Sequence, residues 1–130
     1  MADNASLDLD KAITDLQKQL TILTKVFEKQ VDKYVGKSAN KLEAYMKKNR
    51  KWTDRSERAR QGLVAKWEKG PTETDWKITL AHSVSYGVFL ELAHEKKYAI
   101  IQPTILVKGP EVMSGFNKIL EKAASIDIKL

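Results

Sequence analysis

Cysteine is absent from this chain, and histidine, proline and glycine are scarce. Without cysteine the protein can form neither a disulfide framework nor a thiolate metal site, which suits a reducing cytosol. No apolar run approaches the roughly 18 residues of a membrane span, and no secretory leader opens the chain. The six glycines are scattered, so no loop is suited to cradle a phosphate. We therefore expect a soluble intracellular protein of one domain, with no cofactor and no membrane contact.

Positive charge is concentrated in one short stretch. Residues 1–70 hold 16 Lys and Arg against 10 Asp and Glu, whereas residues 71–130 hold seven of each. Between Lys47 and Arg60, seven cations and two acids give a charge of +5 in fourteen residues. Such a patch attracts phosphate backbones without regard to sequence, although charge runs are more often solvated helix ends. The residues that we predict to face DNA are Lys47, Lys48, Arg50, Lys51 and Arg55.

The N-terminal region, residues 1–50, has the pattern of one long amphipathic helix. Its apolar seam steps by four and three residues and includes Leu9, Ile13, Leu16, Leu20, Leu23 and Phe27. A continuous helix over residues 7–48 would span about 63 Å, which a small domain cannot cover along its full length. Either the chain turns back near Gly36, or part of the seam contacts other subunits. An ordinary core face is the alternative for the same seam, and the two roles can share the helix.

Residues 51–130 predict a small α+β core that forms one domain together with the first region. Alternation on both sides of Gly70-Pro71 indicates an antiparallel hairpin, with Trp67 and Trp76 as a cross-strand aromatic pair. Residues 86–94 favour a short helix. A break at Gly109-Pro110 precedes a second amphipathic helix, and alternation over residues 126–130 indicates a C-terminal strand.

One carboxylate, Glu91, lies inside the otherwise apolar run from Tyr86 to Ala93. A buried carboxylate needs a cation or several hydrogen-bond donors to offset its desolvation. Arginines of the upstream segment have the forked geometry for this task. We predict a structural ion pair between Glu91 and Arg58 or Arg60.

The arginine segment and the Glu91 run, in this order and at this separation, resemble the tail-completion or neck proteins of long-tailed bacteriophages. The resemblance covers roughly Trp52 to Leu120. It implies a virion protein, present in the host cytoplasm during assembly, that caps the tail tube or docks to the portal as a ring of six around the DNA channel. Family members commonly have glycine where this chain has Glu57 after Arg55-Ser56, and this departure favours a short helix with Ser56 as its N-cap.

Two other classes of function compete with this interpretation. An enzyme would need a constellation such as His82, Glu91, His94 and Glu95 for a metal, or Asp54, Ser56 and His82 for nucleophilic catalysis. Neither spacing is diagnostic, so we predict no catalysis and no metal. A free nucleic-acid-binding module is the remaining alternative, supported only by the basic segment and Trp52.

Overall fold

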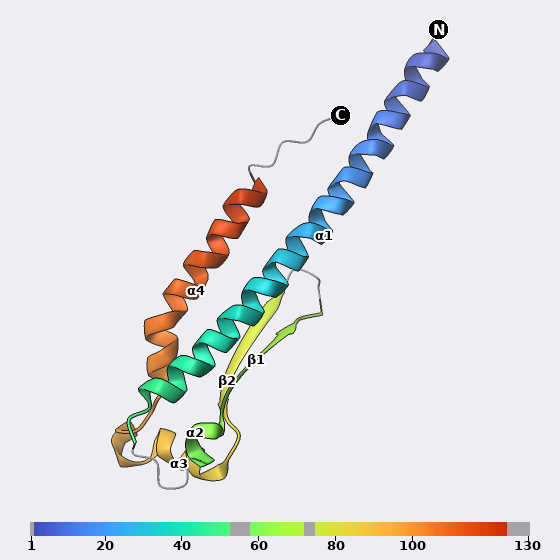
Figure 1. Cartoon of the computed structure of the whole chain (residues 1–130). Helices are drawn as coiled ribbons and strands as arrows, with labels where there is room; N and C mark the ends of the chain where they lie inside the picture. Colours follow the sequence, from blue (N-terminus) through green and yellow to red (C-terminus); the bar gives the residue numbers. More distant parts are fainter. Residues whose placement is uncertain (1, 53–57, 72–74, 125–130) are drawn as a thin grey trace.

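The structure, a computed structural model, describes residues 2–52, 58–71 and 75–124 (Figure 1). Its elements in chain order are α1 (Ala2–Asn49), α2 (Arg58–Gln61), β1 (Leu63–Lys69), β2 (Trp76–His82), α3 (Ser85–Leu92), the 3-10 turn η1 (His94–Lys96) and α4 (Ile101–Ala124). This arrangement confirms the predicted α+β class, with its long N-terminal helix, hairpin, short helix and second amphipathic helix. The C-terminal strand predicted at 126–130 lies outside the described residues.

Helix α1 runs without interruption for 48 residues, so the chain does not turn back at Gly36. Gly36 instead faces the sheet, where an added Cβ would lie 3.3 Å from Nε1 of Trp67. Glycine inside a helix costs about 1 kcal/mol relative to alanine. Here it allows β1 to approach α1 closely. Gly36 therefore serves packing against the sheet and does not break the helix.

Strands β1 and β2 form the predicted antiparallel hairpin. The register places Trp67 opposite Ile78 and Trp76 opposite Lys69. Residues that face each other across an antiparallel pair share one face of the sheet, so both tryptophans lie on the same face. The prediction that they share one face is confirmed, but each lies two residues from the position opposite the other, so they are diagonal neighbours across the hairpin.

The core joins the C-terminal half of α1 to the hairpin and to the start of α4. Met46, Leu63 and Ile100 form a buried apolar cluster, against which Trp52 packs. The buried apolar residues are Val31, Val35, Ala39, Leu42, Met46, Leu63, Leu90, Ala99 and Ile100. All of those that belong to α1 lie at or after Val31, so residues 8–30 contribute no buried apolar side chain to this core.

Helix α4 begins earlier than predicted and continues through Gly109-Pro110. Proline inside a helix removes a backbone hydrogen bond and favours a break. Tertiary contacts hold the segments on both sides of it, since Thr104 is fully buried and the Tyr34 hydroxyl of α1 donates to the carbonyl of Val112 over 2.6 Å. The predicted break is therefore wrong.

The chain reverses between α3 and α4 through η1, which contains no glycine. His94, Glu95 and Lys96 have φ values of 52°, 55° and 65°. Left-handed backbone costs a non-glycine residue roughly 1–2 kcal/mol. The contacts that this reversal creates at the start of α4 must offset that cost.

Candidate assembly surface and the Glu91 junction

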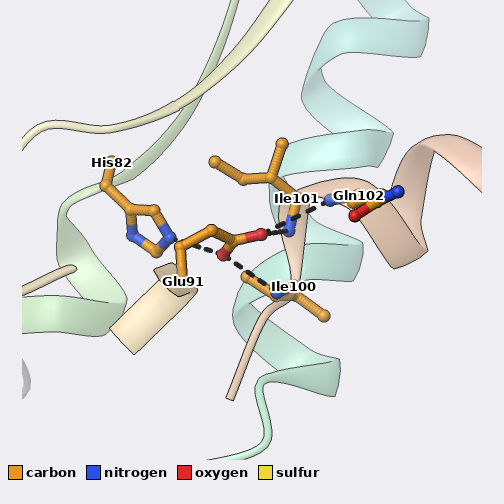
Figure 2. Close-up of polar contacts among 5 residues, drawn as sticks. All are labelled: His82, Glu91, Ile100, Ile101 and Gln102. Carbon is orange, nitrogen blue, oxygen red and sulfur yellow. Dashed lines mark hydrogen bonds and ion pairs between the residues drawn. The ribbon is translucent and has the colours of Figure 1, made fainter. Parts of the chain in front are cut away.

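Glu91 of α3 meets the first turn of α4, as Figure 2 shows. Its Oε2 accepts a hydrogen bond from the backbone N–H of Ile100 over 3.0 Å, and its Oε1 accepts one from Ile101 over 2.9 Å. A longer bond of 3.4 Å comes from the N–H of Gln102. The His82 Nε2 atom lies 2.9 Å from Oε2. One carboxylate therefore joins β2, α3 and α4.

These donors explain why the carboxylate lies there. The first N–H groups of a helix have no partner within the helix, and the helix dipole places positive charge at that end. Glu91, which belongs to α3, accepts hydrogen bonds from these N–H groups. The next residue, Pro103, has no backbone N–H and therefore needs no acceptor. The junction is a cap for α4 that is supplied by tertiary structure.

The environment shifts the pKa of Glu91 in two opposite directions. Burial raises the pKa, whereas the hydrogen bonds from His82 and from the three backbone N–H groups lower it. The hydrogen bonds dominate, and the pKa of Glu91 falls below its ordinary value. The group is therefore an anion at neutral pH, as a cap must be.

The predicted ion pair of Glu91 with Arg58 or Arg60 is wrong. The partners of Glu91 in the described part of the chain are His82 and the N–H groups of α4, and both arginines belong to the short helix α2. The sequence predicted correctly that the Glu91 carboxylate needs partners to offset its desolvation, but it did not predict which groups these are. Helix α2 itself confirms the short helix expected in this segment, whereas Ser56, its predicted N-cap, lies outside the described residues.

His82 is a member of the junction that sequence reasoning did not assign to it. Its side chain is only 2% exposed, and its ring lies 6.1 Å from the ring of Trp52. Gly87 of α3 makes room for it, because a Cβ there would lie 2.5 Å from Nδ1 of His82. The local signal for this contact was weak, since only the glycine inside an apolar helix indicated a close approach.

Two of the predicted DNA-facing residues, Lys47 and Arg50, interact with groups of α1. Lys47 lies 3.6 Å from Glu43, and Arg50 donates to the carbonyl of Lys47 over 2.5 Å. Lys48 and Lys51 are exposed. Arg55 lies outside the described residues. The structure thus leaves two exposed lysines near the end of α1, and contact of this segment with DNA stays a prediction.

The seam predicted to contact other subunits has an exposed part and a half-buried part. Leu9 is 61% exposed, Ile13 is 47% exposed and Leu20 is 45% exposed. Leu16, Leu23 and Phe27 are half-buried, and Phe27 meets the ring of Trp76 edge-on at 6.3 Å. We call residues 8–26 the arm. Figure 1 shows this end of α1 projecting beyond the hairpin and α4.

Further apolar surface lies on α4 and α3, where the sequence predicts only amphipathic or buried helices. Leu106 and Met113 of α4 are 69% and 58% exposed, and Leu92 of α3 is 66% exposed. A mostly apolar groove of about 430 Å³ runs between β2 and α4, with Ile78 and Phe116 in its walls. Exposed apolar surface on this scale is typical of an interaction surface.

The residues considered for a metal site do not all come together among those that the structure describes. His82 and Glu91 meet at the junction, whereas His94 is exposed and packs between the rings of Phe89 and Tyr98. Within residues 2–52, 58–71 and 75–124, no three His, Asp or Glu side chains form a group that could hold a metal ion. Asp54 and Ser56, from the second candidate set, fall outside these ranges.

Comparisons with protein-family models, with curated proteins and with solved structures found no match to this chain. A search of the described helices found none with the length and apolar character needed to cross a membrane.

Proposed function

We propose that this protein acts by assembly: it completes the tail, or joins head to tail, in the particle of a long-tailed bacteriophage. It does so as one subunit of a ring, a hexamer in the form that the resemblance implies, around the DNA channel. Its neighbours are other copies and portal, neck or tail-tube proteins. The protein resides in the virion and passes through the host cytoplasm during assembly, and it carries out no catalysis.

The observation that carries this proposal is the arm. Its seam presents large apolar side chains to solvent, including Leu9 at 61% exposure and Ile13 at 47%. Burying one such side chain fully contributes about 1.5–3 kcal/mol. A chain that keeps this seam outside its own core gains that free energy only by contact with another molecule, which is the property of an assembly component.

The assignment to a phage particle rests on the sequence resemblance between Trp52 and Leu120. The structure adds a physical role for Glu91, the most distinctive residue of that stretch. Glu91 holds α3, β2 and the start of α4 together. Of these elements, β2 and α4 line the apolar groove and pack against α1. In a ring, elements joined in this way would present these surfaces at a constant angle to the neighbouring subunits, which a regular assembly requires.

Removal of residues 1–26 tests the proposal. This deletion spares Phe27, which meets Trp76, and Val31, which is fully buried. We expect the shortened chain to unfold cooperatively. When it replaces the full chain in the phage that encodes it, we expect electron microscopy to show heads and tails that are not joined.

Particles of normal appearance that contain the shortened chain would contradict the role of the arm. Absence of the full-length protein from purified virions would contradict the proposal as a whole. Loss of cooperative unfolding in the shortened chain would show that the arm belongs to the core of the subunit.

A further inference from the structure

A second groove, of about 660 Å³, lies between α1 and α4, which run side by side (Figure 1). We call it the lysine groove, because Lys41 and Lys48 of α1 and Lys108 of α4 line it. Glu111 is the acid among its lining residues, so three lysines and one glutamate give its walls a charge of +2. The groove therefore attracts anions.

This charge is not explained by contacts within the helices. A lysine in a helix pairs with acids three or four positions away, and around Lys41 and Lys48 those positions hold no acid. Lys47, outside the groove, instead lies 3.6 Å from Glu43. The helix dipole favours Lys48, in the last turn of α1, but it accounts for neither Lys41 nor Lys108. The lysine groove thus keeps an excess of positive charge.

A buried hydroxyl adds a hydrogen-bond donor to the groove. Ser38 lines it and is only 6% exposed. Within the described part of the chain the Ser38 hydroxyl makes no hydrogen bond, whereas Thr21 and Thr24 of α1 each donate to the carbonyl four residues earlier. A buried polar group without a partner is unfavourable. Ser38 therefore offers a donor to a ligand in the groove.

Contacts between the two helices fix the shape of the lysine groove. The Tyr34 hydroxyl donates to the carbonyl of Val112, and Gly115 leaves room for that hydroxyl. Across the groove, the Lys108 ammonium lies 5.0 Å from the centre of the Tyr45 ring on α1. A cation is attracted to an aromatic face, so Lys108 extends from α4 toward α1. The lysines of both walls therefore border one space.

The size of the groove and the row of lysines along it favour a chain of phosphates over a single ion. A volume of about 660 Å³ is in the range of pockets that hold whole small molecules. Lys41 and Lys48 are seven residues apart, about 10.5 Å along α1. Phosphates follow one another every 3.4 Å along the axis of a DNA strand, so a strand that passes both lysines presents several phosphates to them. The row continues beyond α1 with Lys51, which is exposed.

We propose that the lysine groove binds the phosphate backbone of duplex DNA. Lys41, Lys48 and Lys108 each contact a phosphate, and the Ser38 hydroxyl donates to a phosphate oxygen, as serine often does in DNA complexes. Of the basic segment predicted to face DNA, the groove includes only Lys48. Binding itself is a property of the free protein, whereas its role in the particle, to turn this face toward the DNA channel, rests on the proposed function.

The salt dependence of DNA binding tests the lysines. Fluorescence anisotropy follows a labelled duplex of about 20 base pairs at about 50–200 mM salt. Lys41→Gln combined with Lys108→Gln should lower the log-log slope by about 1.8, because two contacts of about 0.9 each are lost. Lys66→Gln combined with Lys118→Gln is the matched control, since both residues are exposed, lie outside the groove and remove the same charge. The control pair should leave the slope unchanged.

Replacement of the hydroxyl gives a different result. Ser38→Ala should weaken binding about two- to ten-fold at fixed salt without changing the slope, because a neutral donor releases no counterions. Alanine is the better helix former, so α1 should be retained. Ser114→Ala is the control, because Ser114 is exposed on α4 outside the groove, and it should not alter binding.

Competition identifies the ligand. A nucleoside triphosphate and a poly-glutamate peptide, each at the same concentration of negative charge as the duplex, should not displace it. Displacement by the triphosphate would assign the groove to a free nucleotide, and displacement by the peptide would assign it to an acidic protein segment. Either result would overturn the assignment to DNA.

The groove would also be refuted by equal slopes of the groove pair and the control pair, or by natural affinity of Ser38→Ala. These results are independent of the particle experiment. A protein that is present in virions, but whose groove variants bind DNA as the natural chain does, refutes the groove alone. Groove-dependent binding by a protein that is absent from virions supports the groove and refutes the proposed function.

Discussion

At the scale of single residues, Glu91 determines how α3, β2 and α4 fit together. Glu91→Gln keeps the shape but turns an amide N–H₂ group toward donors and removes the charge from the start of α4. We expect a loss of about 1–3 kcal/mol in the free energy of unfolding at neutral pH, measured by thermal or urea unfolding. Glu111→Gln is the control, because Glu111 is 69% exposed in its contact with Lys108, and such pairs contribute under about 1 kcal/mol. Equal stability of the two variants would contradict the capping role.

The same carboxylate makes stability depend on pH in a defined direction. Its pKa in the folded protein is lowered from the ordinary value of 4.5, so in acid the unfolded chain takes up the proton first. The stabilisation is complete above that ordinary value and is lost as the pH falls through the lower, folded pKa. The difference in stability between the natural chain and Glu91→Gln should therefore shrink in this acid range. A difference that stays constant down to the lowest pH at which both fold would contradict this prediction.

At the scale of elements, the two halves of α1 share one sequence pattern, but one half packs in the core and the other forms the exposed arm. Leu42 is 8% exposed within the core, whereas Leu20 is 45% exposed on the arm. Leu42→Ala should reduce the free energy of unfolding by about 2–5 kcal/mol. Leu20→Ala should reduce it by less than about 1 kcal/mol, since alanine is at least as good a helix former and little burial is lost.

This comparison is best made by urea unfolding of dilute protein, in which contacts between subunits would be dissociated. Equal losses in the two variants would show that the arm packs within its own subunit. A larger loss for Leu42→Ala would support the division of α1 into a core half and an assembly half.

At the scale of the whole molecule, the net charge of +6 predicts contact with DNA that is weak and nonspecific. A channel component must let a genome pass, so tight binding would oppose its role. We expect affinity in the micromolar range or weaker at about 150 mM salt, with a log-log salt dependence of about 0.9 per phosphate contact. Replacing Lys47, Lys48 and Lys51 together with Gln should flatten that dependence without affecting the fold.

The matched control replaces Lys66, Lys77 and Lys118 with Gln, because these exposed lysines lie outside the basic segment and the change in charge is the same. Filter binding or fluorescence anisotropy at several salt concentrations measures both variants. Nanomolar, sequence-selective binding that survives high salt would favour the nucleic-acid module over the assembly protein.

The sequence by itself determined the elements whose pattern is local. The seam from Leu9 to Phe27 predicted α1, and alternation around Gly70-Pro71 predicted the hairpin, because helix and strand periods depend only on backbone geometry between near neighbours. The isolated Glu91 also indicated correctly that a buried carboxylate needs compensation. The need of a residue such as Glu91 for polar partners can thus be predicted from its neighbours in the sequence.

Tertiary structure decided which partners meet these requirements. The donors to Glu91 come from the first turn of α4, nine to eleven positions along the chain, and the η1 reversal brings them there. Pro110 stays inside α4 because contacts such as that of Tyr34 with Val112 hold the helix on both sides. The boundary between core and arm on α1 depends on where α4 and the hairpin end. The seam is alike on both sides of that boundary, so its own sequence could not reveal which half is covered.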